Sequence, residues 1–227
     1  MSVHTADGHE YGAEAVLIAT GSTYRRLGVP GEDDLIGAGI HFCATCDAAF
    51  YKNSEEIMVI GGGNSAGEES LFLTKFAKKV TIITNTPELT ASEVVKLKVA
   101  ETPAIEVIGD STVAEFKGGK RVESVVVKNL KSGETRELHP AGVFVFIGLT
   151  PNTKFLGAKS DIKLDKAGFI ETSAMLETSV PGVFAAGDVR LGSTKQAASA
   201  AGEGATAALM VRNYLKEQAE AANARAA

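Results

Sequence analysis

The chain has 227 residues, 44% of them hydrophobic, and a formal net charge of -5 at pH 7. This length and this apolar content suffice for one large or two small globular domains with buried cores. Lysine and arginine are dispersed rather than clustered, so the sequence offers no basic surface for nucleic acid. The opening residues carry no secretory signal, and no apolar run reaches the roughly 18 residues of a membrane helix, so we expect a cytoplasmic protein without a membrane segment.

The first elements expected along the chain are a β-hairpin at residues 3–12, turning at Asp7 and Gly8, and a buried strand at residues 15–19. An Asp-Gly pair favours the positive φ angles of a tight hairpin turn. A short apolar run that stops at a glycine is typical of a core strand. Residues 27–34 combine glycine, proline and carboxylates, and we interpret them as a linker.

A βαβ unit is predicted next, with a strand at 57–60, an amphipathic helix as far as residue 78 and a second strand at 80–83. Such a unit predicts the α/β class, with a Rossmann-like, three-layer dinucleotide-binding domain. A chain break is expected at 148–152, and the end of the chain from residue 219 should be frayed. Further strands are expected at 105–108, 111–116, 121–130, 141–147, 169–171 and 182–186, and a long helix from about 195 to 217.

The turn of the βαβ unit carries a G-x-G-x-x-A pattern at Gly61, Gly63 and Ala66, directly after a strand and before a helix. In this context the first glycine permits the tight turn, the second lets the backbone approach a pyrophosphate, and the alanine allows close helix packing. Asn64 and Ser65 begin the helix, whose free N–H groups attract phosphate. We therefore predict a dinucleotide site at these residues.

The residues after the second strand bear on which dinucleotide is bound. A carboxylate at this place binds the adenosine ribose, whereas arginines bind a 2′-phosphate. Here Asn85 is positioned to bond ribose hydroxyls, and no arginine lies between Lys79 and Lys96. On charge alone, NADH is favoured over NADPH.

Cys43 and Cys46 are the only two cysteines and have C-x-x-C spacing. This spacing lets the sulfurs close a small, reducible ring, and neighbouring dipoles lower the pKa of one thiol. Asp47 follows directly and could carry the proton of an exchange reaction. Two alternatives stay open: half of a zinc site, for which further ligands are missing, and two inert buried cysteines. His41 is interpreted as a structural or partly exposed residue, and no metal site is predicted.

The strand at 182–186 ends in Gly187 and Asp188, and a helix follows near Gln196 and Ala197. An aspartate at a strand end can accept bonds from ribitol hydroxyls, and a helix N-terminus can meet flavin oxygens or phosphate. From these residues alone, an ordinary strand-to-helix turn is the simpler interpretation.

Three motifs, in order and spacing, closely resemble the low-molecular-weight thioredoxin reductases: Cys43-Ala-Thr-Cys-Asp47, Gly61-Gly-Gly-Asn-Ser-Ala66-Gly-Glu-Glu69 and Gly182-Val-Phe-Ala-Ala-Gly-Asp188. Ala19-Thr20-Gly21 and Gly148-Leu-Thr-Pro-Asn152 match the two interdomain segments of that family. The resemblance covers essentially the whole chain. It implies that an NAD(P)-binding domain at 25–149, which contains the C-x-x-C motif, is inserted into an FAD-binding domain formed by 1–24 and 150–227.

The resemblance also implies a function. Electrons would pass from NAD(P)H through FAD to the Cys43–Cys46 disulfide and on to a thioredoxin-like protein, with the enzyme a homodimer. Cys46 would face the flavin, Cys43 would attack the partner disulfide and Asp47 would be the acid/base. Residues toward FAD would be Thr20, Gly21, Gly187, Asp188, Gln196 and Ala197.

Two departures from the family pattern lead to further expectations. No glycine-rich turn for the FAD pyrophosphate precedes residue 15, so we expect a truncated form that binds FAD weakly. The basic segment that binds the NADPH phosphate is replaced by Thr84, Asn85 and Thr86, so the donor is NADH or another reductant. The alternatives to a disulfide reductase are a non-catalytic nucleotide-binding remnant and a flavin reductase with a different donor.

Overall fold

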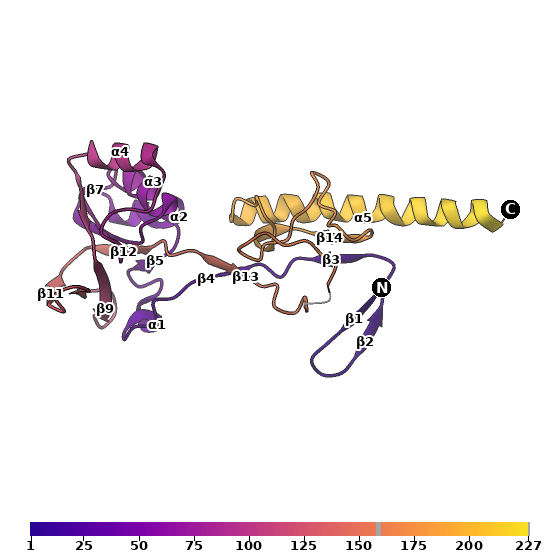
Figure 1. Ribbon diagram of the computed structural model, residues 1–227, viewed down its shortest axis with the longest axis horizontal. Coiled ribbons are helices and arrows are strands. Elements are labelled where there is room, and N and C mark those ends of the chain that lie inside the picture. The colour runs from indigo at the N-terminus through magenta and orange to yellow at the C-terminus, as the bar shows by residue number, and fades with distance from the viewer. Residues whose placement is uncertain (158–159, 227) are drawn as a thin grey trace. The chain divides into compact units, whose positions relative to one another are not determined.

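The computed structural model describes residues 1–157 and 160–226 (Figure 1). The chain divides into two compact units, each built around cores of its own. Unit 1 combines Met1–Thr23 with Leu149–Ala227, and unit 2 is Tyr24–Gly148. Residues 158, 159 and 227, which belong to the expected segment 150–227, lie outside the described residues.

Unit 2 is built on a five-stranded parallel sheet of order β5-β12-β6-β7-β8. The strands predicted for the βαβ unit are β6 and β7, at its centre. Their apolar runs suit a parallel sheet, which is covered on both faces. The five strands are β5 Ile40–His41, β6 Ser54–Ile60, β7 Ala77–Ile83, β8 Ile105–Ile108 and β12 Gly142–Val145.

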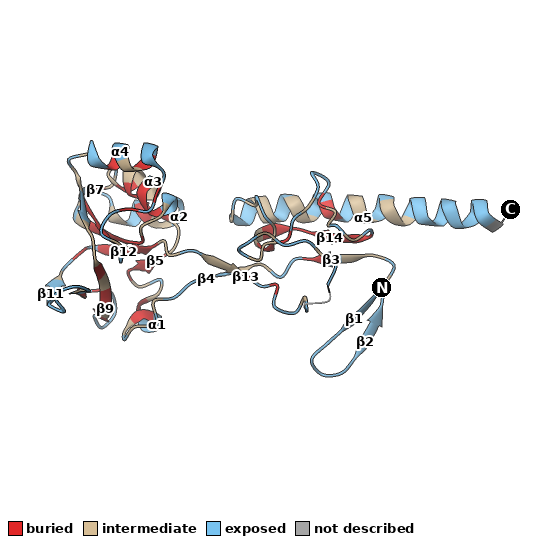
Figure 2. Ribbon diagram, in the orientation of Figure 1, coloured by how far each residue is buried: buried red, intermediate tan, exposed pale blue. Residues whose placement is uncertain are grey.

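The two faces of this sheet lie against different layers. Alternate residues of β6 point to opposite sides: Ile57 and Val59 pack with helix residues such as Leu73, whereas Met58 and Ile60 pack with strand residues such as Val125. One face is thus covered by helices and the other by the antiparallel sheet β11-β10-β9 (Figures 1 and 2). The second layer contains β9 Ser111–Lys117, β10 Ser124–Asn129 and β11 Thr135–Leu138.

The helices of unit 2 are short. The helix after the glycine turn, α3 Asn64–Leu73, ends before residue 78 because the next strand already begins at Ala77. The other helical elements are α1 Glu32–Leu35, α2 Ala44–Asp47, the 3-10 helix η1 Ala48–Tyr51 and α4 Glu93–Ala100.

In its described residues, unit 1 contains three strand pairs and a long helix. The predicted hairpin is confirmed as β1 Ser2–His4 with β2 Glu10–Gly12. The predicted core strands are β3 Val16–Ile18 and β14 Val183–Ala185, which pair in parallel. The remaining elements are β4 Ser22–Tyr24, which continues one residue into unit 2, β13 Leu149–Pro151, which pairs with it, the 3-10 helix η2 Gly187–Val189 and α5 Ala197–Ala226.

Two expectations for unit 1 were wrong. Residues 169–171 form no strand, since Ile170 makes only isolated bridges to Leu164 and Arg190. Helix α5 continues to Ala226 instead of fraying from residue 219. Alanine has the highest helix propensity, and five of the residues 219–226 are alanine. No helix of the described residues is long and apolar enough to span a membrane, and those residues hold no cluster of three metal-ligating side chains.

Candidate functional site

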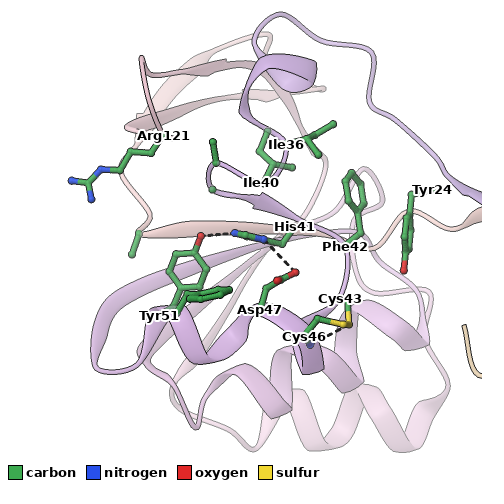
Figure 3. A pocket seen from close by; sticks show the side chains of 15 residues that line it. Tyr24, Ile36, Ile40, His41, Phe42, Cys43, Cys46, Asp47, Tyr51 and Arg121 are labelled. Carbon is green, nitrogen blue, oxygen red and sulfur yellow. Dashed lines mark hydrogen bonds and ion pairs between the residues drawn. A yellow bond between two sulfur atoms is a disulfide. The ribbon is translucent and has the colours of Figure 1, made fainter. Parts of the chain in front are cut away.

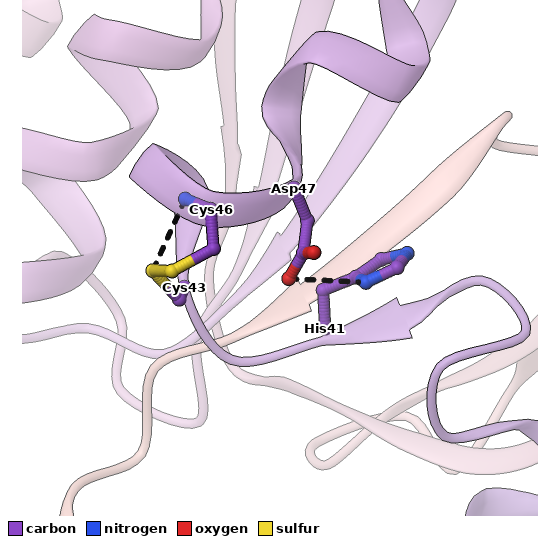
Figure 4. Close-up of a disulfide and its surroundings, with 4 residues drawn as sticks. All are labelled: His41, Cys43, Cys46 and Asp47. Atoms are coloured by element: carbon purple, nitrogen blue, oxygen red, sulfur yellow. Dashed lines mark hydrogen bonds and ion pairs between the residues drawn. A yellow bond between two sulfur atoms is a disulfide. The ribbon is translucent and has the colours of Figure 1, made fainter. Parts of the chain in front are cut away.

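The cysteine pair begins helix α2 of unit 2. Cys43 and Cys46 are joined in a disulfide, with their Cα atoms 5.3 Å apart (Figure 4). Cys43 is also the N-cap residue, and its Sγ accepts a hydrogen bond from the Cys46 backbone N–H at 3.1 Å. A backbone N–H directed at a cysteine sulfur in this way is a group that can stabilise a thiolate. The structure thus joins the two cysteines as the first interpretation expected, and the reducibility of the disulfide stays a prediction.

The disulfide opens into a cavity of about 620 Å³ within unit 2, which is also lined by His41, Asp47 and Tyr51 (Figure 3). Phe42, which precedes Cys43 and lines the same cavity, contacts two further groups. Its ring stacks on Tyr24 with the centroids 4.8 Å apart, and the Arg26 guanidinium carbon lies 4.7 Å from the ring centroid. An aromatic ring and a guanidinium group therefore contact the residue that precedes Cys43.

His41 links Asp47 to Tyr51. Its Nδ1 lies 3.3 Å from Asp47 Oδ2, and its Nε2 lies 2.6 Å from the Tyr51 hydroxyl (Figures 3 and 4). Burial lowers the pKa of His41, and the Asp47 charge opposes this. Burial, and secondly the Asp47 charge, raises the pKa of Tyr51. The sequence did not reveal this link between Asp47, His41 and Tyr51, because the three residues come from three separate elements.

The three glycines of the turn after β6 differ in what a side chain at each position would meet. Gly61 has a φ of 142°, and a Cβ there would collide with the Phe146 carbonyl oxygen. A Cβ at Gly62 would collide with Thr84 Oγ1. At Gly63 a Cβ would meet nothing within 4 Å, and this residue is the N-cap of α3 without a capping side chain. The turn thus presents open backbone at a helix N-terminus, which is the geometry that binds phosphate.

A second cavity of about 460 Å³ lies over this turn. It is lined by Gly61, Gly63, Asn64, Ser65 and Asn85, all predicted from the sequence to bind nucleotide, and the structure brings these five together. Asn64 also has a structural bond, because its Oδ1 accepts from the Ser92 N–H at 2.7 Å.

Ala66 is fully buried behind the glycine turn. In helix α4, Lys96 Nζ lies 3.0 Å from Glu93 Oε1 and 3.9 Å from Glu88 Oε1. This lysine is therefore already paired with carboxylates.

The predicted residues of unit 1 form two groups. Thr20 and Gly21 bond to the Asn152 segment: Thr20 Oγ1 donates to the Asn152 carbonyl at 2.8 Å, and the Asn152 N–H donates to the Gly21 carbonyl at 3.0 Å. Gly187 and Asp188 lie in η2, after the buried strand β14.

The Asp188 region also contains residues that the sequence did not reveal. Glu203 Oε2 accepts the Gly187 N–H at 2.7 Å, and Lys195 Nζ donates to the Asp188 carbonyl at 2.6 Å. Among the described residues, Asp188 Oδ1 is buried and has no hydrogen-bond partner. A buried carboxylate oxygen in this state fits a ligand hydroxyl as its missing donor. Gln196 and Ala197 stand at the start of α5.

Comparison with known proteins places this chain among redox enzymes. Residues 2–204 match the family described as pyridine nucleotide-disulphide oxidoreductase. Thioredoxin reductase from Peptoclostridium acidaminophilum is 42% identical over 217 residues, which cover 93% of this chain and 68% of that protein.

Solved structures give the same result. The thioredoxin reductase structure from Streptococcus pyogenes aligns with a TM-score of 0.87 and 38% identity, over 95% of this chain and 70% of that one. The one from Giardia duodenalis aligns with a TM-score of 0.86 and 40% identity, over 93% of this chain and 69% of that one. The chain thus spans somewhat more than two thirds of the length of each of these relatives.

Proposed function

Since this chain belongs to the thioredoxin reductases of the pyridine nucleotide-disulphide oxidoreductase family, we propose that it passes electrons from a nicotinamide dinucleotide to its Cys43–Cys46 disulfide and then to a thioredoxin-like protein. The observation that carries the proposal is this disulfide, which opens into a cavity beside Asp47. A disulfide that is reached from a cavity can be reduced and can exchange with a second disulfide.

Membership of this family implies FAD and NAD(P)H as cofactors. FAD, when bound, supplies a two-electron carrier between the nicotinamide and the disulfide. We propose residues 25–149 as the nucleotide-binding domain and residues 1–24 with 150–227 as the FAD-binding segments. The orphan Oδ1 of Asp188 supports a role in holding ribitol, together with Gly187, Gln196, Ala197 and the Thr20 and Gly21 pair.

The chain's own residues would carry the exchange as follows. The thiolate of Cys43 attacks one sulfur of the partner disulfide, whose S–S bond breaks while a Cys43 mixed disulfide forms. The leaving sulfur takes a proton from the Asp47 carboxyl. Cys46 then attacks Cys43 and its thiol proton passes, by way of the Asp47 carboxylate, to the second partner sulfur, which leaves as a thiol while the Cys43–Cys46 disulfide is restored. The partner gains two electrons and the cysteine pair loses two.

NADH is proposed as the preferred donor. Asn85 is exposed and lines the nucleotide cavity, and the nearby Lys96 is paired with Glu93. A 2′-phosphate would therefore meet no arginine in this loop, whereas ribose hydroxyls would meet the neutral amide of Asn85. A cytoplasmic location and a homodimer are proposed on the family resemblance alone.

The test is a count of thiols. The purified chain, with excess FAD and without oxygen, is mixed with NADH or with NADPH, and thiols are then titrated. We expect both cysteines to become titratable, at least as fast with NADH as with NADPH, and addition of thioredoxin to return them to the disulfide. The Cys46→Ser variant is the control for nonspecific reduction.

Two outcomes would contradict the proposal. An unchanged thiol count in a chain that binds nucleotide would indicate the non-catalytic remnant. A clear preference for NADPH would leave the reductase function in place and refute the donor argument.

A further inference from the structure

The linked side chains of Tyr51, His41 and Asp47 are not part of the disulfide, but they line the same cavity (Figure 3). His41 lies at the end of β5 and is only 8% exposed. Its ring centroid is 5.3 Å from that of Phe144, and the Tyr51 ring stands edge-on to Phe144 at 5.8 Å. Both rings are thus fixed by a core residue of β12.

Tyr51 is also fixed by a glycine. A Cβ at Gly142 would collide with the Tyr51 ring and lie 2.7 Å from its hydroxyl oxygen. Gly142 has no left-handed φ, so its backbone does not need glycine. The absence of a side chain therefore makes room for Tyr51 at the place where its hydroxyl meets His41.

The chemistry of these three side chains determines which atoms donate and which atoms accept in their hydrogen bonds. Once Asp47 has given up its proton, its carboxylate only accepts hydrogen bonds, so in that state the His41 Nδ1 carries the hydrogen that faces Asp47. The other nitrogen of a neutral ring is then an acceptor, and it takes the Tyr51 O–H at 2.6 Å. Burial favours this neutral ring by lowering the pKa of His41. Arg121 also lines the cavity.

We propose that His41, held by Tyr51, is a positioning residue that aims the Asp47 carboxyl at the thiol leaving group during disulfide exchange. The inference rests on the proposed function and adds two residues to it. When Asp47 gives its proton to the leaving sulfur, it becomes a carboxylate, and the Nδ1–H of His41 is already directed at it. Hydrogen bonds that are in place before charge develops stabilise that charge without reorganisation.

The experiment uses leaving groups of different basicity. The full chain is reduced with dithiothreitol, desalted and mixed at one pH with excess bis(hydroxyethyl) disulfide or with excess dithiobis(nitrobenzoate). The aliphatic thiolate is a basic leaving group that needs a proton, and the aromatic thiolate is a weak base that does not. The ratio of the two first-step rates cancels any change in the thiolate fraction of Cys43.

We expect Asp47→Asn to slow the aliphatic reaction about 100-fold and the aromatic one no more than about threefold, as for loss of a general acid. His41→Leu should slow the aliphatic reaction at least about tenfold with the same sparing of the aromatic one. Tyr51→Phe keeps the ring packing and should show the same selectivity, while His41→Gln, which retains an N–H donor, should recover part of the rate. His139→Leu changes an exposed histidine of the same unit and is the matched control.

Each contrary outcome has its own meaning. If His41→Leu and Tyr51→Phe react like the native chain while Asp47→Asn is slow, the inference fails and the proposed function stands. If both probes are slowed equally by loss of His41, its role is structural and the inference also fails. If the reduced native chain reacts with neither probe, the proposed exchange itself fails.

Discussion

Replacing Gly142 by alanine should perturb the position of Tyr51, because the three atoms nearest to the new Cβ all belong to that side chain. Gly142 begins β12 and pairs with Ile57 of β6. Because its φ is not left-handed, alanine fits the backbone. The added methyl group instead meets the Tyr51 ring and hydroxyl, and the ring must move away from His41.

The magnitude has two parts. Overpacking against a ring typically costs about 1–3 kcal/mol. Loss of the Tyr51–His41 hydrogen bond adds about 1 kcal/mol. We therefore expect Gly142→Ala to lower the free energy of unfolding by about 2–4 kcal/mol. Tyr51 is only partly buried, so its ring can yield toward solvent and the cost does not rise further.

The assay is urea unfolding of the native chain, Gly142→Ala, Tyr51→Ala and the double variant. In the Tyr51→Ala background, Gly142→Ala should cost less than about 0.5 kcal/mol, because the obstructing ring is gone. Gly119→Ala is the control, since a Cβ there meets nothing within 4 Å. If the two substitutions prove additive, or if Gly142→Ala is as stable as Gly119→Ala, the steric argument is refuted.

Two further predictions concern nucleotide binding and acid stability. Gly63→Val should fold like the Gly119→Val control, because a Cβ at either position has open space. In calorimetric titration it should nevertheless bind NADH at least about tenfold more weakly, which corresponds to about 1.4 kcal/mol. An affinity equal to that of the native chain would refute the phosphate site. The hydrogen bond from Arg190, with that from the Gly187 N–H, holds the pKa of Glu203 below its usual range. The stability that the ionised Glu203 contributes is present above the unfolded-state pKa of about 4.3 and is lost as the pH falls through the lower folded value. The melting temperature of Glu203→Gln should therefore fall less at acid pH than that of the native chain. Parallel pH dependences of the two melting temperatures would contradict this.

Much of unit 2 could be predicted from the sequence because its signals are local. The glycine turn lies between an apolar strand and a helix, and β6 and β7 contain the strands that this pattern predicts. Cys43 and Cys46 are three positions apart, so their pairing needs no distant contact. Where a site consists of one turn or one short segment, periodicity and spacing are sufficient.

The parts that were missed depend on tertiary contacts. His41 reaches Asp47 and Tyr51 only because β5 runs beside β12 in the sheet. Residues 169–171 have the composition of a strand but find no neighbouring strand for a ladder. The orphan oxygen of Asp188 is likewise a property of burial, which no residue pattern reveals.

The glycine turn and the loop after β7 are joined by hydrogen bonds, so a change in one segment is transmitted to the other. The Gly62 carbonyl accepts both the Thr90 N–H at 2.7 Å and Thr90 Oγ1 at 3.1 Å, and Asn64 Oδ1 holds the Ser92 N–H at 2.7 Å. A redesign of donor choice that grafts a foreign loop at residues 84–92 would therefore also displace the backbone of the glycine turn. Engineers who wish to exchange one coenzyme for another in this scaffold should transplant the turn, Asn64 and that loop as a single cassette.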